Sequence, residues 1–267
     1  MIKPGEIQQT AREAGVRDQQ IEKDYILSWI LQGMAQHGPL SKCLIFKGGT
    51  VLKKAYFEDY RFSEDLDFTL TDKHISKEKI FEWFDEVYAY IKEEANIPLE
   101  IIDNSEHEDG GINFYISYTG PLGGQVSNKK VKVDISRSEQ LVFEPDTRPL
   151  FTPYSDLESA RLPCYSLEEI LVEKMRSVLQ RMAARDFYDI WYLTEVAEIE
   201  AAHYLNEFKI KCERKNLDPE HFIKKISDRL PQYKGRWESS LSEQIQDLPD
   251  FDVVVREVQR KLRKVKL

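Results

Sequence analysis

The chain has 267 residues, of which 41% are hydrophobic and 32% are charged, and its net charge at pH 7 is −9. This composition is that of a globular protein with a sizeable core, and the negative charge argues against a general nucleic-acid coat protein. No apolar run approaches the roughly 20 residues of a membrane-spanning helix, so no membrane partner is expected. The three cysteines are widely spaced and odd in number, which argues against a disulfide framework or cysteine metal cluster and favours a reducing cytoplasm.

The first part of the chain predicts helices and short strands in alternation. Apolar side chains at helical spacing, or a capping serine, place the helices at residues 18–35, around Val51–Phe57 and at 76–95. Alternation of apolar and polar side chains places the strands at Cys43–Phe46, Leu66–Leu70, and about residues 98–103, 111–118 and 129–136.

From about residue 166 the chain predicts helices only. Ser166 and Glu169 have the spacing of a capping box, and an apolar helical stripe follows from Ile170 to Met182. The expected fold is therefore α+β. A mixed sheet with flanking helices is expected in residues 1–160, followed by an α-helical unit in residues 161–267.

One aspartate lies on the strand expected at Leu66–Leu70 and another directly precedes it. Because side chains alternate along a strand, Asp65 and Asp67 share one face, while Leu66 and Phe68 point to the core. Two carboxylates on one face repel each other unless a cation lies between them. Mg²⁺ suits this position, since it takes carboxylate oxygens, keeps waters and bridges to phosphates, with Mn²⁺ as the alternative ion.

A glycine turn precedes this strand by about fifteen residues. At Gly48 and Gly49, backbone N–H groups can approach a phosphate without a Cβ in the way, and Thr50 adds a hydroxyl. A glycine pair alone is common in tight turns, and two alternate aspartates alone are moderate evidence. Their combination is more specific, and it predicts a triphosphate site beside a metal site.

A two-metal centre would need a third carboxylate, which Asp134 on the strand at 129–136 can supply. Asp134 shares a face with Lys132, so an exposed ion pair is the alternative, and the metal role is the preferred interpretation. Two further residues precede the aspartate pair. Arg61 can contact phosphate or pair with Glu64, and Ser63 can bond a phosphate or shape the turn.

Several segments together resemble a known family. They are FKGGTVLKKAY with RFSEDLDF, then VKVDIS, then EEILVEKMRSVLQRMAARDFYDIWYL, and the lead-in helix IEKDYILSWIL. They resemble the AbiEii-type nucleotidyltransferase toxins of type IV toxin–antitoxin pairs, within the DNA polymerase beta-like nucleotidyltransferase superfamily. The resemblance covers roughly residues 18–195 and implies a nucleotidyltransferase-type mixed sheet.

The resemblance also implies a set of functional residues. Asp65 and Asp67 would bind metal, Gly48 and the residues after it would hold the triphosphate, and Lys174 and Asp186 would be essential. The implied reaction moves a nucleotide from an NTP to an acceptor hydroxyl. RNA, at the 3′ end of tRNA as in some relatives, is the expected acceptor, and a cognate antitoxin is a further expected partner. The alternatives are a protein acceptor at the same site, or an NTP-binding partner protein without turnover.

Lys174 and Asp186 each have a second interpretation. A lysine on a partly apolar helix face often extends its charge to solvent, whereas the resemblance favours a contact with phosphate. On one continuous helix, Asp186 would point about 120° away from Lys174. The two residues meet only if the helix breaks near Ala183–Arg185. Asp186 could then cap a second helix, with Asp189 as its N3 acid, or orient the nucleotide, the acceptor hydroxyl or Arg185.

The charge is unevenly distributed along the chain. Residues 203–267 carry 15 Lys and Arg against 11 Asp and Glu, and six of the basic residues lie between Arg256 and Lys266. This tail could neutralise phosphates of RNA, or it could be a solvated terminal helix.

Overall fold

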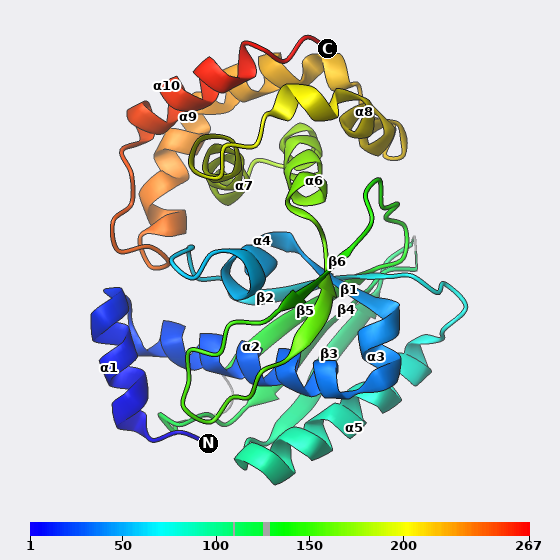
Figure 1. Cartoon of the computed structure of the whole chain (residues 1–267), viewed down its shortest axis with the longest axis vertical. Coiled ribbons are helices and arrows are strands. Elements are labelled where there is room, and N and C mark those ends of the chain that lie inside the picture. The colour runs from blue at the N-terminus through cyan, green and yellow to red at the C-terminus, as the bar shows by residue number, and fades with distance from the viewer. Residues whose placement is uncertain (109, 125–128) are drawn as a thin grey trace. The chain divides into compact units, whose positions relative to one another are not determined.

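The structure, a computed structural model, describes residues 1–108, 110–124 and 129–267 (Figure 1). The chain divides into two compact units. The first comprises Met1–Glu139 and Pro145–Cys164, and the second comprises Gln140–Glu144 and Tyr165–Leu267. The first unit holds the sheet and the second is helical, so the expected α+β fold is confirmed.

The helices of the first unit lie mostly in its N-terminal part. They are α1 (Pro4–Ala14), α2 (Asp18–Gln36), α3 (Gly38–Cys43), α4 (Gly48–Val51) and α5 (Lys77–Ala95). Helices α2 and α5 confirm two of the predicted helices. The helix expected around Val51 begins earlier, at Gly48, because the glycine turn itself forms its first turn, and it continues as a π-helical turn over Leu52–Tyr56.

A seven-stranded mixed sheet has the order β3-β4-β5-β2-β1-β7-β6. Its strands are β1 (Leu44–Lys47), β2 (Asp65–Leu70), β3 (Leu99–Glu106), β4 (Ile112–Tyr118), β5 (Lys130–Ser136), β6 (Asp146–Pro149) and β7 (Arg161–Cys164). The pairs β2–β5 and β1–β7 are parallel, and the other neighbours are antiparallel. Strands β1 to β5 confirm the prediction. Strands β6 and β7 are not predicted, because each has only four residues and contains a proline, which has no N–H to donate to a neighbouring strand.

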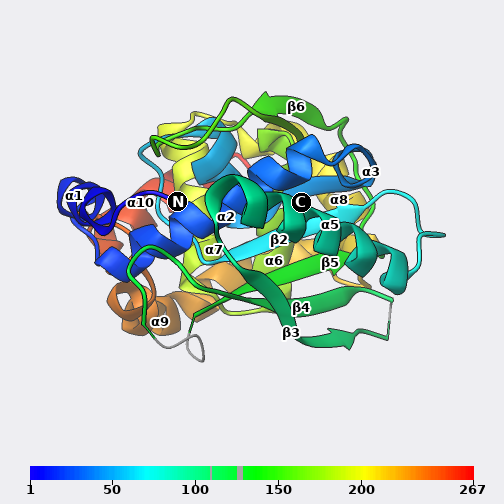
Figure 2. The ribbon, with the colours of Figure 1, turned by 90° about the horizontal axis from the view of Figure 1, so that it is seen from below.

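One face of the sheet forms the core of the first unit. Figures 1 and 2 show α2 and α5 lying along this face. Apolar side chains of β2, β4 and β5 point towards it and are fully buried, each contributing about 1.5–3 kcal/mol to folding. They are Leu66, Phe68, Ile112, Phe114, Ile116, Val131, Val133 and Ile135. Because side chains alternate, the polar residues of β2 and β5 lie on the opposite face.

The second unit is built from helices around an aromatic core. The helices are α6 (Leu167–Gln180), α7 (Ala184–Trp191), α8 (Leu205–Glu213), α9 (Phe222–Leu241) and α10 (Phe251–Leu262), with short turns Tyr192–Val196, Ala201–Tyr204 and Pro219–His221. The ring of Phe187 stacks on Tyr233 at 5.1 Å and also contacts Trp237 and Phe251. The aromatic residues of α7 thus serve the core.

Glu169 explains why the short segment Gln140–Glu144 belongs to the second unit. Ser166 caps α6 by accepting the N–H of Glu169 at 3.2 Å, which is one half of the predicted capping box. The Glu169 carboxylate instead accepts the N–H groups of Val142 at 2.9 Å and Phe143 at 2.8 Å, and it pairs with the buried Lys211. A buried carboxylate needs such partners, so it fixes this segment against α6.

Part of the basic tail is engaged in ion pairs within its own unit. Helix α10 buries an apolar stripe that includes Val254 and Val258. Arg260 pairs with Glu195, and Lys264 pairs with Glu200 at 2.9 Å. These contacts favour a packed terminal helix over a phosphate-binding tail. Within the described ranges, no helix is both long enough and apolar enough to span a membrane.

Candidate active site

Strand β2 places the aspartate pair in the middle of the sheet. Asp65 and Asp67 lie on the polar face and are partly exposed, as the alternation predicts. Asp67 lies directly opposite Lys47 on β1 and directly beside Asp134 on β5. Neighbouring strands are about 4.8 Å apart, so the third predicted carboxylate stands next to the pair.

Lys132 lies among these carboxylates. It is directly beside Asp65 across the β2–β5 pairing, and its Nζ is 3.2 Å from Oδ2 of Asp134. Burial disfavours the ammonium, but the carboxylates of Asp134, Asp65 and Asp67 outweigh it and raise the pKa of Lys132. The ion pair between Asp134 and Lys132 is therefore present in the structure.

The glycine turn lies against the aspartate pair. Gly48 has φ +80°, a left-handed conformation that side chains other than hydrogen rarely adopt. A Cβ at this position would overlap the carboxylate of Asp67 and lie 3.0 Å from its Cγ. Only glycine therefore lets the Asp67 carboxylate approach the backbone at the start of α4.

The residues around the turn are held by buried hydrogen bonds. The hydroxyl of Thr50 bonds with that of Ser63 at 2.7 Å and with the carbonyl oxygen of Asp65 at 2.6 Å. Ser63 therefore helps to shape the turn, one of the two roles left open by the sequence. Arg61 is buried, and its Nη1 donates to the carbonyl oxygen of Phe62 at 3.3 Å.

The carboxylates fit a divalent cation only in part. Within the part of the chain that the structure describes, no three His, Cys, Asp or Glu side chains are grouped so as to hold a metal ion. Asp134 is bound to Lys132 instead. The pair Asp65 and Asp67 still has the right chemistry for Mg²⁺, because this ion commonly takes one or two carboxylates and completes its shell with water and phosphate oxygens.

A break between helices of the second unit brings Lys174 and Asp186 together. Helix α6 ends at Gln180 and α7 begins at Ala184, so of the two alternatives that the sequence left open the helix does break, over residues 181–183, slightly before the expected place. Lys174 Nζ lies 2.9 Å from Oδ1 of Asp186. The alternative that Asp186 caps the second helix does not hold, because α7 starts at Ala184 and Ala183 occupies the cap position.

Lys174 and Asp186 belong to a buried charge network. Lys174 Nζ also lies 2.6 Å from Oδ2 of Asp189, and Arg181 contacts both oxygens of Asp186 at 2.7 and 3.0 Å. Burial alone would raise the pKa of Asp186, but Lys174 and Arg181 lower it below the usual value. Sequence reasoning missed Asp189 as a partner of Lys174. Its spacing of three residues from Asp186 on one helix face is the signal that could have found it.

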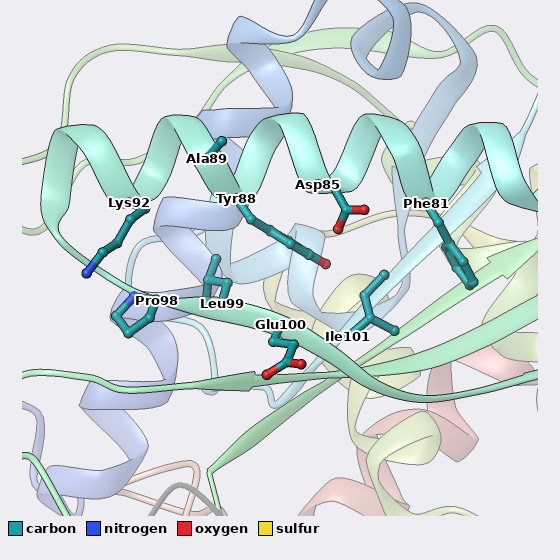
Figure 3. A pocket seen from close by; sticks show the side chains of 9 residues that line it. All are labelled: Phe81, Asp85, Tyr88, Ala89, Lys92, Pro98, Leu99, Glu100 and Ile101. Atoms are coloured by element: carbon teal, nitrogen blue, oxygen red, sulfur yellow. The ribbon is translucent and has the colours of Figure 1, made fainter.

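A separate groove lies between α5 and β3, away from every predicted site residue. It has a volume of about 560 Å³, and Figure 3 shows Tyr88 directed from α5 towards β3 within it. The Tyr88 hydroxyl is buried without a hydrogen-bond partner among the described residues. The groove carries Asp85, Lys92 and Glu100 but no arrangement that suggests transfer chemistry.

Comparisons with known proteins identify the family and the fold of the chain. The chain matches the family model described as nucleotidyl transferase AbiEii toxin, type IV TA system, over residues 29–262. No curated protein matches it. Because the family match spans most of the chain, it establishes the family, whereas the solved structures below establish the fold.

Three solved structures share the fold. MenT4, a nucleotidyltransferase toxin from Mycobacterium tuberculosis H37Rv, has a TM-score of 0.64 and 18% identity, covering 99% of this chain and 90% of that one. JHP933 from Helicobacter pylori has a TM-score of 0.59 and 17% identity, covering 94% and 93%. A putative nucleotidyltransferase from H. pylori has a TM-score of 0.58 and 18% identity, covering 94% and 96%. The chain belongs to the AbiEii nucleotidyltransferase toxin family of type IV toxin–antitoxin systems and is a nucleotidyltransferase.

Proposed function

We propose that this toxin transfers a nucleoside monophosphate from an NTP to a hydroxyl of RNA, with the 3′ end of tRNA as the preferred acceptor, in a metal-dependent reaction. The observation that carries the proposal is the contact between two motifs: the backbone at Gly48 lies against Asp67, on the sheet face that also carries Asp65 and Asp134. A triphosphate held at the turn would then meet the carboxylates directly.

The carboxylates form the metal-binding part of the proposal. Asp65 and Asp67 would hold Mg²⁺, or Mn²⁺ in its place, and Asp134 stands beside Asp67 as a third ligand. When bound, the ion supplies charge neutralisation on the triphosphate and a lower pKa for the attacking hydroxyl.

The glycine turn supplies the triphosphate grip. The N–H groups of Gly48 and Gly49 would bind phosphate oxygens, and the Thr50 and Ser63 hydroxyls, which bond to each other, would hold the turn in shape or lend a donor. Arg61 adds a buried positive charge just before β2. A turn fixed by these bonds needs little reorganisation when the nucleotide binds.

Lys174 and Asp186 are the proposed functional residues of the second unit. Lys174 would neutralise charge on the triphosphate, and an ammonium suits this role as a point charge on a flexible stem. Asp186 and Asp189 hold its Nζ at 2.9 and 2.6 Å, so the lysine side chain is positioned before substrate arrives. Arg181 in turn holds Asp186.

The acceptor can be identified with each α-³²P-labelled NTP in turn, Mg²⁺ and total cellular RNA, followed by a denaturing gel. We expect label on a tRNA-sized band with one nucleotide or a few. The label should be absent with Asp65→Asn and present with Asp103→Asn, a control on the exposed part of β3. Label on protein alone would indicate that the acceptor is a protein and not RNA. NTP binding without any labelled product would indicate a nucleotide-binding partner protein without turnover.

A further inference from the structure

Lys132 lies on the acidic face of the sheet, and the proposed reaction gives it no role. It stands directly beside Asp65, while its neighbour on the same face of β5, Asp134, stands directly beside Asp67. The four side chains therefore lie at the corners of one patch on two parallel strands. Among these four side chains three are carboxylates and one is an ammonium, and Lys47 of β1 stands directly opposite Asp67 at the edge of the patch.

The ammonium of Lys132 is bound to the carboxylate that a metal would need. Its Nζ is 3.2 Å from Oδ2 of Asp134, and both side chains are only about one-third exposed, at 34% and 32%. The ammonium therefore lies among three carboxylates, at a place where a divalent cation would also be attracted.

Two effects follow for a divalent ion at this patch. Asp134 has an oxygen engaged by Lys132, so fewer ligand atoms are available without a rearrangement. The positive charge of Lys132 also repels the incoming ion, although water at this partly exposed site weakens the repulsion.

We propose that Lys132 is an internal counter-cation of the active site that occupies Asp134 and weakens divalent-metal binding until nucleotide is present. The triphosphate brings negative charge that attracts the ammonium away from Asp134, which then becomes available as a third ligand. Metal binding is thereby coupled to nucleotide binding. This inference rests on the metal site of the proposed function and assigns a role to a residue of that same face.

The test measures Mn²⁺ binding to the full-length chain without nucleotide, using the electron paramagnetic resonance signal of free Mn²⁺. Lys132→Met removes the charge but keeps the length of the side chain, and it should tighten Mn²⁺ binding roughly tenfold. Lys132→Arg keeps the charge and should bind as the wild type does. Lys130→Met is the matched control, because Lys130 lies on the same face but its Nζ is 4.3 Å from the ring centroid of Tyr115. It should leave Mn²⁺ affinity unchanged.

Unchanged or weaker Mn²⁺ binding by Lys132→Met would overturn the proposal. If that variant also bound a non-hydrolysable NTP analogue more weakly, Lys132 would be a phosphate ligand instead. Lys132→Gln provides a second neutral variant if the methionine variant does not fold. Asp65→Asn separates this inference from the proposed function. If that variant bound Mn²⁺ with wild-type affinity, Asp65 would not be a metal ligand, and the proposed metal site and the role of Lys132 would both be wrong.

Discussion

At the scale of single residues, Gly48 and Asp67 depend on each other. Gly48 adopts φ +80°, and the Asp67 carboxylate fills the space that a Cβ would need. A side chain at position 48 would therefore both strain the backbone and displace a proposed metal ligand. The two effects can be separated, because another glycine of the first unit has the same kind of backbone in open space.

Gly48→Ala should reduce nucleotide transfer by roughly a hundredfold or more, since displacing a reacting group by about 1 Å has a cost of that order. It should also lower the free energy of unfolding by about 1–2 kcal/mol through backbone strain. Gly123→Ala is the control: Gly123 has φ +62° and no atom within 4 Å of a built Cβ. The control should lose about as much stability in urea as Gly48→Ala and should keep full transfer activity. Equal activity of the two variants would contradict the account.

Residues recognisable by type and local spacing could be predicted. The alternation of side chains along the strand predicts that Asp65 and Asp67 share one face, and the glycine pair predicts the turn at Gly48. The same alternation on β5 predicts the face of Asp134. The spacing of Asp189 from Asp186 places both on one helix face, but the contact of Asp189 with Lys174 also depends on where α6 ends, which no local pattern determines. Sequence spacing alone gave Asp189 only a helix-capping role.

At the scale of elements, the break between α6 and α7 creates the charged cluster of the second unit. Without it, Lys174 and Asp186 would point apart on one helix. The break turns α7 so that its first two turns present Asp186 and Asp189 to the lysine, and both carboxylates are buried. The ion pairs and the helix–helix junction therefore support each other.

Asp189→Asn should lower the free energy of unfolding by about 3 kcal/mol, because it removes one partner of a buried charge. It should also lower nucleotide transfer, since Lys174 loses a group that positions it. Asp228→Asn, in the exposed pair with Lys224, is a matched control in the same unit and should leave both properties unchanged. Urea unfolding followed by tryptophan fluorescence measures the difference. Wild-type stability of Asp189→Asn would rule out the buried pair as described.

Elements were predictable where a periodic pattern had enough length to be recognised. The strand alternation of β4 and β5 and the apolar face of α5 gave their positions within a few residues. Strands β6 and β7 are too short and carry prolines, so their pairing is decided by the sheet they join. The attachment of Gln140–Glu144 to the second unit depends on the distant Glu169, which no local pattern indicates.

At the scale of the whole molecule, each unit has its own core and at least one buried cysteine whose reactivity can report the unfolding of that unit. Cys43 and Cys164 are buried in the first unit and Cys212 in the second. Burial raises the pKa of Cys43 to about 11 and those of Cys164 and Cys212 to about 12. A pKa of 11 leaves roughly one thiolate in a thousand at pH 8, so the native thiols should be unreactive.

Thiol labelling at pH 8 in increasing urea should therefore report the unfolding of each unit. We expect negligible labelling in buffer. Cys43 and Cys164 should become reactive at the same urea concentration, and Cys212 should become reactive at the urea concentration that unfolds the second unit. Peptide mass spectrometry identifies the labelled residues. Rapid labelling of any cysteine in buffer, or separate transitions for the two thiols of the first unit, would contradict the division into these cores.

The most direct test of the central claim is Mg²⁺-dependent pyrophosphate release from NTP with total RNA present, compared between the wild type and Asp65→Asn. The carboxylate is partly exposed, so the variant should unfold at the same urea concentration as the wild type. We predict release by the wild type that stops on chelation of Mg²⁺, and a rate at least roughly a thousandfold lower for Asp65→Asn. Release by Asp65→Asn at the wild-type rate would contradict the assignment of chemistry to the face of β2.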